Sequence, residues 1–328
     1  MKALIVCHAG VGVGLGHLSR ALVVSRALKL ELGAQVKLLI QGDALSIQDY
    51  DKSQYQFIPS QESLSKSVSQ IARQYDINLL VFDLHPMQVP LDIDDLFEEL
   101  RSYSCKLIAV DGLVGHSSFL DMVFIPAFDF KLPPNARNKS KFVFGWDCFL
   151  LNVKKKPTPW KPGKKVLILS GGSDATKLGE NWPSALNEGL PANVDLNWIT
   201  GPYAQAPVWP KSPRIKMHNH IAPLGLDDLM TKAHYAVTVY GVSFYELLYY
   251  GIPTVVFSPY GNKDNSELKA ISEMGMALVA NDEFDAIRKL KLLMGDSRLA
   301  SSMSLKSLHQ MSVLGGNRIA KCIAKLID

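Results

Sequence analysis

The sequence has few cysteines, and their spacing excludes the common cysteine-based frameworks. The four cysteines stand at positions 7, 105, 148 and 322 of a 328-residue chain, and no C-x-x-C pair occurs among them. Cys7 and Cys105 adjoin apolar, strand-like runs. We therefore expect reduced, buried thiols and neither disulfides nor a cysteine-bound metal.

Long hydrophobic runs and a strong net charge are also missing. No apolar run approaches the roughly 18 residues of a membrane span, and the chain opens on a strand-like run without a basic leader. The formal net charge is +4, with 47% hydrophobic and 20% charged residues, which is typical of a soluble globular protein and does not indicate a nucleic-acid partner. These properties predict a cytoplasmic protein with two domains of ordinary size.

Complete nucleotide-binding motifs are absent too. The glycines at positions 12, 14 and 16 miss the dinucleotide fingerprint because the third arrives one residue early, and no Gly-Lys-Ser/Thr follows. No convincing acid follows the strand expected at 35–40, which argues against a dinucleotide oxidoreductase. The D-x-D pattern at 92–94 falls in a polar loop or helix start, so we expect no bound metal.

The glycine-rich stretch at 10–16 is nevertheless the most informative feature of the chain. It follows an apolar, strand-like run at 1–7 and precedes a helical pattern at 21–30. Such a turn approaches a ligand closely, and the helix start offers N–H groups and a positive dipole end. Gly14 and Gly16 are therefore candidate ligand-binding residues, for a phosphate or a developing negative charge.

His17 follows these glycines, at the mouth of the turn. A neutral imidazole there could act as a general base, since catalytic groups gather at the carboxyl ends of parallel strands. The alternative is a histidine that caps the helix or bonds a neighbouring loop. Asp83 and Asp111 each end a predicted strand and are expected as additional bases or substrate-orienting groups, or else as loop caps.

Strands and helices alternate along the chain, which predicts doubly wound parallel sheets. Three prolines within 157–162 interrupt the pattern, so we place an N-terminal domain at 1–155, a linker at 156–164 and a C-terminal domain at 165–328. We expect two Rossmann-like α/β domains that face each other across a cleft, with a ligand between them. The basic runs at 131–141 and 154–165 either form solvated surface or attract an anionic membrane or an acidic acceptor.

The second half carries two more glycine turns. Ser170, Gly171, Gly172 and Ser173 offer N–H groups and hydroxyls at an expected helix start, a cradle for a diphosphate. The segment 241–246 places Gly241, Ser243 and Glu246 at another helix start. A carboxylate at position 246 could bind a ribose diol or merely complement the helix dipole.

The order and spacing of these motifs, taken together, resemble those of a known group of enzymes. G-x-G-H-L-x-R at 14–20, S-G-G-S-D at 170–174, G-x-S-x-x-E at 241–246 and G-I-P at 251–253 resemble the nucleotide-sugar enzymes of the GT-B fold. Among these, the chain is similar to the MurG-type glycosyltransferases and the PseG-type UDP-sugar hydrolases of pseudaminic acid synthesis. The likeness runs almost end to end.

The resemblance implies a role for each matched position. His17 would be the general base or charge stabiliser near the anomeric carbon, Gly14 and Gly16 would let the turn approach the diphosphate, and Arg20, which ends the first motif, would contact substrate. Ile221 would lie by the nucleobase, Glu246 at the ribose, Ser243 and the turn at 170–173 at the phosphates, and Asn265 at the sugar hydroxyls. The chain departs from the pattern at 264–265, where Asp-Asn replaces the transferase glutamine, and at 111–116, where the hydrolase pattern is missing.

The function that this implies is a metal-independent, inverting glycosyltransferase that takes a nucleoside-diphosphate sugar, expected to be UDP-linked, as its substrate and needs no cofactor. The acceptor would be a glycan, lipid or small molecule in cell-envelope or surface-glycan synthesis. One alternative is a PseG-like hydrolase with water as nucleophile, and another is a non-catalytic nucleotide-sugar binding protein.

Overall fold

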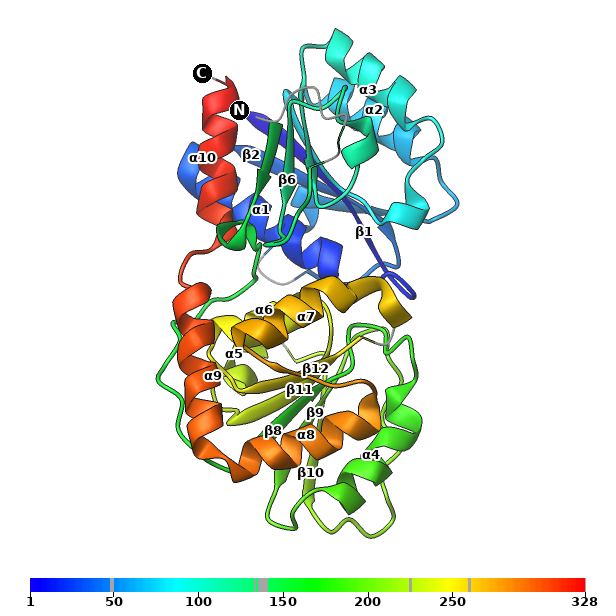
Figure 1. The fold of residues 1–328 in the computed structure, drawn as a ribbon. Coiled ribbons are helices and arrows are strands. Elements are labelled where there is room, and N and C mark those ends of the chain that lie inside the picture. Colours follow the sequence, from blue (N-terminus) through cyan, green and yellow to red (C-terminus); the bar gives the residue numbers. More distant parts are fainter. Residues whose placement is uncertain (48–49, 133, 135–140, 224–225, 259–260, 328) are drawn as a thin grey trace. The chain divides into compact units, whose positions relative to one another are not determined.

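The computed structural model describes residues 1–47, 50–132, 134, 141–223, 226–258 and 261–327. The chain divides into two compact units, one of residues 1–152 with the segment from 313 onward and one of residues 153–312 (Figure 1). Each unit has a parallel sheet with helices on both faces, so the predicted fold class of two Rossmann-like α/β domains is confirmed.

The sheet of the first unit has seven strands in the order β3-β2-β1-β4-β5-β6-β7. Every pairing in it is parallel. The strands are β1 (Lys2–Ala9), β2 (Gln35–Gly42), β3 (Tyr55–Ile58), β4 (Leu79–Asp83), β5 (Lys106–Val110), β6 (Met122–Ile125) and β7 (Phe142–Phe144).

Strand β1 is covered on both faces, as its continuous apolar sequence predicts. Ile5 points into a core that is shared with α1 and α10, and Leu4 points into the opposite core with α2 and α3. Both side chains are fully buried. The helices are α1 (Gly16–Leu32), α2 (Leu64–Gln74), α3 (Ile93–Ser102) and α10 (Gly315–Ile327).

The C-terminal helix α10 belongs to the first unit, whereas the sequence analysis assigned it to a domain at 165–328. Ile319 and Ile323, one turn apart, are buried in the core that also holds α1, and α10 lies beside α1 in Figure 1. The Gly315 N–H donates to the carbonyl of Phe149 at 2.9 Å. A periodic apolar face predicts a helix but does not say which sheet the helix covers. Local sequence patterns therefore could not predict that the second unit ends before α10.

The second unit has a six-stranded sheet in the order β10-β9-β8-β11-β12-β13. Its strands, all parallel, are β8 (Lys165–Leu169), β9 (Asp195–Thr200), β10 (Lys216–Ile221), β11 (Tyr235–Val239), β12 (Thr254–Phe257) and β13 (Leu278–Val279). Its helices are α4 (Leu178–Gly189), α5 (Leu226–Met230), α6 (Val242–Tyr249), α7 (Asn265–Met274), α8 (Glu283–Gly295) and α9 (Ser297–Gln310).

Helices cover both faces of this sheet as well. Trp182 of α4 and Leu290 of α8 pack with Trp198 of β9 on one face. Met230 of α5 and Leu247 of α6 pack on the other. No helix in the described ranges is both long and apolar enough to cross a bilayer.

The strand order fixes where ligands are expected. In the first unit the chain moves from β1 outward to β3 and then returns to β4 on the other side of β1. The second unit repeats this plan, with β11 returning beside β8. The order therefore reverses between β1 and β4 and between β8 and β11, and ligands of open α/β sheets bind at such points, beyond the carboxyl ends of the strands.

Two strands escaped the sequence analysis, β7 and β10. Strand β7 has only three residues, and β10 is an edge strand whose sequence, KMHNHI, is mostly polar and partly exposed. Neither carries the buried apolar run by which the other strands were found. The helix expected from Leu224 begins outside the described residues, which resume at the start of α5, and most of the basic run at 131–141 also lies outside them.

The glycine loop after β1 is fixed by the end of β2. Asp43 donates its N–H to the carbonyl of Ala9 at 3.0 Å and accepts the Val11 N–H on its carboxylate at 2.8 Å. Gly42 makes this approach possible, because its φ is +135° and a Cβ there would lie 1.8 Å from the Ala9 carbonyl oxygen.

Gly42→Ala should therefore destabilise the first unit by about 3 kcal/mol or more, since a backbone clash of this kind has no side chain that can move away. Urea unfolding measures the loss. Gly115→Ala is the matched control, because Gly115 has no positive φ and a Cβ there would meet nothing within 4 Å. Equal stability of the two variants would contradict the assigned clash.

His8, at the end of β1, supports the loop after β4. Its Nδ1 accepts the His85 N–H at 2.9 Å, so Nε2 carries the proton and donates to Oε1 of Gln41 at 3.3 Å. Burial, reinforced by the positive charge of a protonated His17, lowers the pKa of His8 to about 4. The neutral imidazole is therefore the form on which the loop depends.

This arrangement predicts a loss of stability in mild acid. In the unfolded chain His8 takes up a proton near its ordinary pKa of 6.5, whereas in the folded protein its pKa is about 4. The contribution of His8 is thus complete above about pH 6.5 and falls by up to about 3 kcal/mol as the pH drops to 4. His8→Asn, which keeps an acceptor for the His85 N–H, should flatten this part of the stability curve. His309→Asn, at an exposed helix position, should leave it unchanged.

Candidate active site

The glycine loop places His17 at the edge of the first sheet where the carboxyl ends of the strands lie. Gly10 and Gly14 pair across the loop, with the Gly14 N–H donating to the Gly10 carbonyl at 2.8 Å, and Gly14 has a φ of +78°. Gly16 then opens α1, and Leu15 at the N-cap provides no side-chain cap. His17 is therefore the second residue of a helix whose first N–H groups are not capped by a side chain of the N-cap residue.

His17 pairs with Asp83, the last residue of β4. Nδ1 of His17 lies 2.7 Å from Oδ1 of Asp83. Burial alone would raise the pKa of Asp83, but the charges of Arg20 and His17 lower it below its usual range. Asp83 is therefore a carboxylate that can only accept. Nη2 of Arg20 also lies 3.1 Å from Nδ1, but it donates to Oδ1 of Asp83 at 2.7 Å, so the shorter contact of His17 with Asp83 decides that the proton of neutral His17 sits on Nδ1. Nε2 keeps a free lone pair, and among the described residues it has no hydrogen-bond partner.

Arg20, one turn further along α1, holds the carboxylates in place. It donates from Nε to Oδ2 of Asp83 at 2.8 Å and from Nη2 to Oδ1 at 2.7 Å. Nη1 donates to Oδ2 of Asp111 at 2.7 Å. Arg20 was expected to bind substrate, yet most of its N–H groups are directed at these two acids. The side chains of Arg20 and Asp83 are 11% and 2% exposed, whereas that of Asp111 is 45% exposed and accessible to a ligand.

The backbone around Asp111 is strained. Asp111 and Leu113 adopt φ values of +66° and +62°, a region that costs energy for residues other than glycine. The strain places the carboxylate of Asp111 at the end of β5 within reach of Arg20. Four residues expected at the site from sequence, His17, Arg20, Asp83 and Asp111, thus form one hydrogen-bonded network.

The sequence analysis missed His85 in this region. Its ring stands edge-on to that of His17, with centroids 5.7 Å apart and an interplanar angle of 77°. Its Nδ1 accepts the Met87 N–H at 3.4 Å, so it also caps the short helical turn at Pro86–Gln88. The available signal was its position, two residues after Asp83 in the loop that leaves a central strand.

The turn after β8 is separated from the helix that follows it by a short segment. Gly171 has a φ of +93°, but α4 starts only at Leu178, and the first N–H groups of that helix are taken by Asp174 at 3.0 and 2.8 Å. The turn at 170–173 therefore ends before the helix begins, and the carboxylate of Asp174 accepts from the first N–H groups of α4. Ser170 is 4% exposed, and its hydroxyl has no hydrogen-bond partner among the described residues.

The turn after β11 does lead directly into a helix. Gly241 is the N-cap of α6 and provides no side-chain cap, the first turn contains no acid, and a Cβ at Gly241 would meet nothing within 4 Å. Ser243 is half-buried in that first turn, and Glu246 is 7% exposed. An anion could approach these N–H groups and the positive helix end without displacing a protein carboxylate.

The remaining candidates follow other strands of the second sheet. Ile221 ends the edge strand β10 and is 68% exposed, two strands away from β8. Asn265 opens α7, is exposed, and donates from Nδ2 to Oδ1 of Asn262 at 2.9 Å. Ser170 to Ser173 and Gly241 to Ser243 follow the adjacent strands β8 and β11, so they share one edge, whereas Ile221 and Asn265 follow or precede other elements of this unit. Nor do the described residues include a cluster of three or more histidine, cysteine, aspartate or glutamate side chains suited to a metal ion.

Comparisons with known proteins agree with this architecture. No family profile matches the chain. A curated but uncharacterized protein of Methanocaldococcus jannaschii is 24% identical over 96% of this chain and 68% of its own length. MurG of Acinetobacter baumannii is 16% identical, with a TM-score of 0.63 over 99% of this chain and 100% of that one. UDP-GlcNAc 2-epimerase of Neisseria meningitidis, solved with UDP-GlcNAc, is 12% identical, with a TM-score of 0.62 over 100% and 99%.

Two parallel-sheet units and end-to-end structural similarity to MurG and to this epimerase identify the chain as a protein of the GT-B fold.

Proposed function

We propose that this protein is a nucleotide-sugar-dependent glycosyltransferase. The observation that carries the proposal is the 2.7 Å contact between Nδ1 of His17 and Oδ1 of Asp83. It directs the proton of neutral His17 to Nδ1 and leaves Nε2 as a base at the edge of the sheet where ligands bind. The fold, shared with transferases and with an epimerase solved with UDP-GlcNAc, supports a UDP-sugar as the donor.

The proposed reaction is a direct displacement with inversion. Nε2 of His17 takes the proton of an acceptor hydroxyl as its oxygen bonds to the anomeric carbon, and the bond from that carbon to the diphosphate breaks. Asp83 stabilises the imidazolium that forms, since its carboxylate stays ionised beside Nδ1. Arg20 acts as a positioning residue, because its paired hydrogen bonds hold Asp83 in the orientation that His17 needs. Asp111 is the exposed acid that would orient the acceptor.

We propose that the second unit binds the nucleoside diphosphate. The uncapped start of α6 at Gly241 and Ser243 suits the phosphates, and no metal step is needed for that contact. The buried hydroxyl of Ser170, which has no partner among the described residues, would complete the phosphate site with Gly171, Gly172 and Ser173. In this assignment Glu246 binds the ribose, Ile221 lies by the base and Asn265 contacts the sugar.

The acceptor proposed here is a glycan, a lipid or a small molecule of surface-glycan synthesis, glycosylated in the cytoplasm, with peripheral membrane contact where the acceptor is a lipid. The same residues would also serve a hydrolase with water in place of the hydroxyl. The two reactions differ only in the nucleophile that reaches His17.

His17→Ala should lower turnover by roughly 10²- to 10⁴-fold, the usual contribution of a general base, while the Kd for UDP stays unchanged. Turnover is followed by UDP release and affinity by calorimetry. His116→Ala is a matched control, because His116 forms a similar pair with Asp94 at 2.6 Å elsewhere in the first unit. Full turnover in His17→Ala, or an equal loss in His116→Ala, would remove His17 from the mechanism.

A panel of UDP-, GDP- and TDP-sugars, incubated with and without acceptor extracts, decides between transfer and hydrolysis. A transferase should release the diphosphate quickly only when an acceptor is present, and the product should have the opposite anomeric configuration to the donor. Rapid release in water alone would establish the hydrolase in place of the transferase. Binding of a donor without any conversion, under either condition, would leave a nucleotide-sugar binding protein and overturn both enzymes.

A further inference from the structure

A cavity lies in the first unit at the amino ends of β1 and β2, the opposite edge of the sheet from His17. Its volume is about 500 Å³. It exists because β3 is shorter than β2: pairing of β1 with β2 begins at Lys2 and Gln35, but pairing of β2 with β3 begins only at Leu38. The first residues of β2 therefore lack a strand neighbour on their outer side, and the cavity occupies that space.

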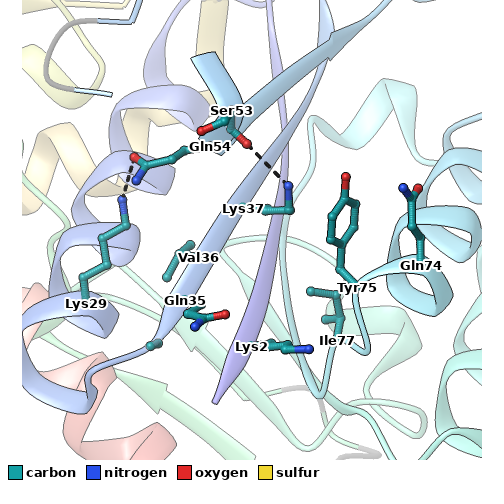
Figure 2. Close-up of a pocket in the computed structure, with 11 residues that line it drawn as sticks. Lys2, Lys29, Gln35, Val36, Lys37, Ser53, Gln54, Gln74, Tyr75 and Ile77 are labelled. Atoms are coloured by element: carbon teal, nitrogen blue, oxygen red, sulfur yellow. Dashed lines mark hydrogen bonds between the residues drawn. The ribbon is translucent and has the colours of Figure 1, made fainter. Parts of the chain in front are cut away.

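The charged side chains that line this cavity are all cationic. Lys2 comes from β1, Lys37 from β2 and Lys29 from the last turn of α1, and no carboxylate is among the lining residues. Figure 2 shows Lys29 reaching in from α1, with Tyr75 on the opposite side of β2. The other polar side chains that line the cavity, including that of Gln35, are uncharged.

Two of these lysines have only neutral partners. Lys29 donates to Oε1 of Gln54 at 3.2 Å and lies 4.3 Å from the centroid of the Tyr50 ring. Lys37 donates to the Ser53 carbonyl at 3.4 Å and lies 3.8 Å from the centroid of the Tyr75 ring. Among the described residues neither forms an ion pair, whereas most partly buried cations in proteins find a carboxylate.

The environment of Lys29 shows the effect of this arrangement. Burial lowers the pKa of Lys29 from its ordinary value, because the ammonium group loses water without gaining a counter-charge. Lys2 does pair with Asp76 at 3.3 Å, but both side chains are well exposed and the pair contributes little. The cavity thus keeps an excess of positive charge that an anion would compensate.

We propose that this cavity is a binding site for a small molecule that carries an oligophosphate group. Its volume falls within the range of small-molecule sites and far exceeds the needs of a single ion. Lysine ammonium groups bind phosphate as point charges, and three of them without a carboxylate among the lining residues suit a multiply charged phosphate chain. The site is separate from the residues proposed for transfer, and its occupancy does not depend on that reaction.

The test uses the full chain and inorganic tripolyphosphate as the probe, at about 0.15 M salt so that diffuse surface attraction is screened. Lysine acylation, read by mass spectrometry, should slow at Lys2, Lys29 and Lys37 when the probe is present. Lys66, which is exposed on α2 and outside the cavity, should react at the same rate with and without it.

Affinity of the variants provides the second measurement. Lys29→Gln with Lys37→Gln should raise the Kd for tripolyphosphate at this site about tenfold or more, the usual size of the loss of charge-assisted hydrogen bonds. Lys66→Gln should leave it unchanged. Binding without protection of the three lysines would assign the probe to another site, and uniform protection of all lysines would indicate diffuse attraction. Either result, or the absence of binding, overturns the proposal.

Discussion

The buried carboxylate of Asp83 is the constraint on which the candidate active site depends. A charged group that is 2% exposed is costly unless other charges compensate it, and here Arg20 and His17 do so from one face of α1. The three groups are therefore interdependent: Arg20 keeps Asp83 ionised, Asp83 determines which nitrogen of His17 carries the proton, and that choice leaves the other nitrogen basic. The order in which the strands are connected brings α1 and the end of β4 together, so the site is a consequence of the fold.

The two units apply the same plan with different chemistry. Each has a glycine turn after a central strand that leads into a helix without a side-chain cap at its N-cap, at Leu15 in one and at Gly241 in the other. In the first unit the space beyond the turn is filled by titratable side chains. In the second the first turn of the helix contains no acid and presents its N–H groups and the hydroxyl of Ser243. Proton transfer suits the former environment and anion binding the latter.

Local sequence patterns predicted much of this arrangement, because the relevant signals were local. The buried strands at 106–110, 122–125, 235–239 and 254–257 end where their apolar runs end, and the acids at positions 83 and 111 follow such runs directly. What the sequence could not provide was the partner of each group. Arg20 donates hydrogen bonds to Asp83 and Asp111, which lie 63 and 91 positions away in the sequence. The hydrogen bond between His8 and the His85 N–H joins residues 77 positions apart.

The features that the sequence analysis missed or misassigned also depend on partners that only the folded structure reveals. Asp174 looked like part of a ligand turn, yet its side chain accepts from the N–H groups of Leu178 and Gly179 and caps the start of α4. Strand β10 is polar because it is an edge strand, which only the assembled sheet reveals. His85 has no motif of its own and becomes notable only beside His17.

The return of α10 to the first sheet makes the second unit an insertion within the first. During synthesis the ribosome must therefore complete residues 153–312 before the groove beside α1 can receive Ile319 and Ile323. Until then the nascent first unit displays an apolar stripe, which a chaperone could shield. A fragment that stops near residue 152 would keep that stripe permanently uncovered, and expression of the isolated N-terminal half would need the C-terminal helix supplied on a short tether.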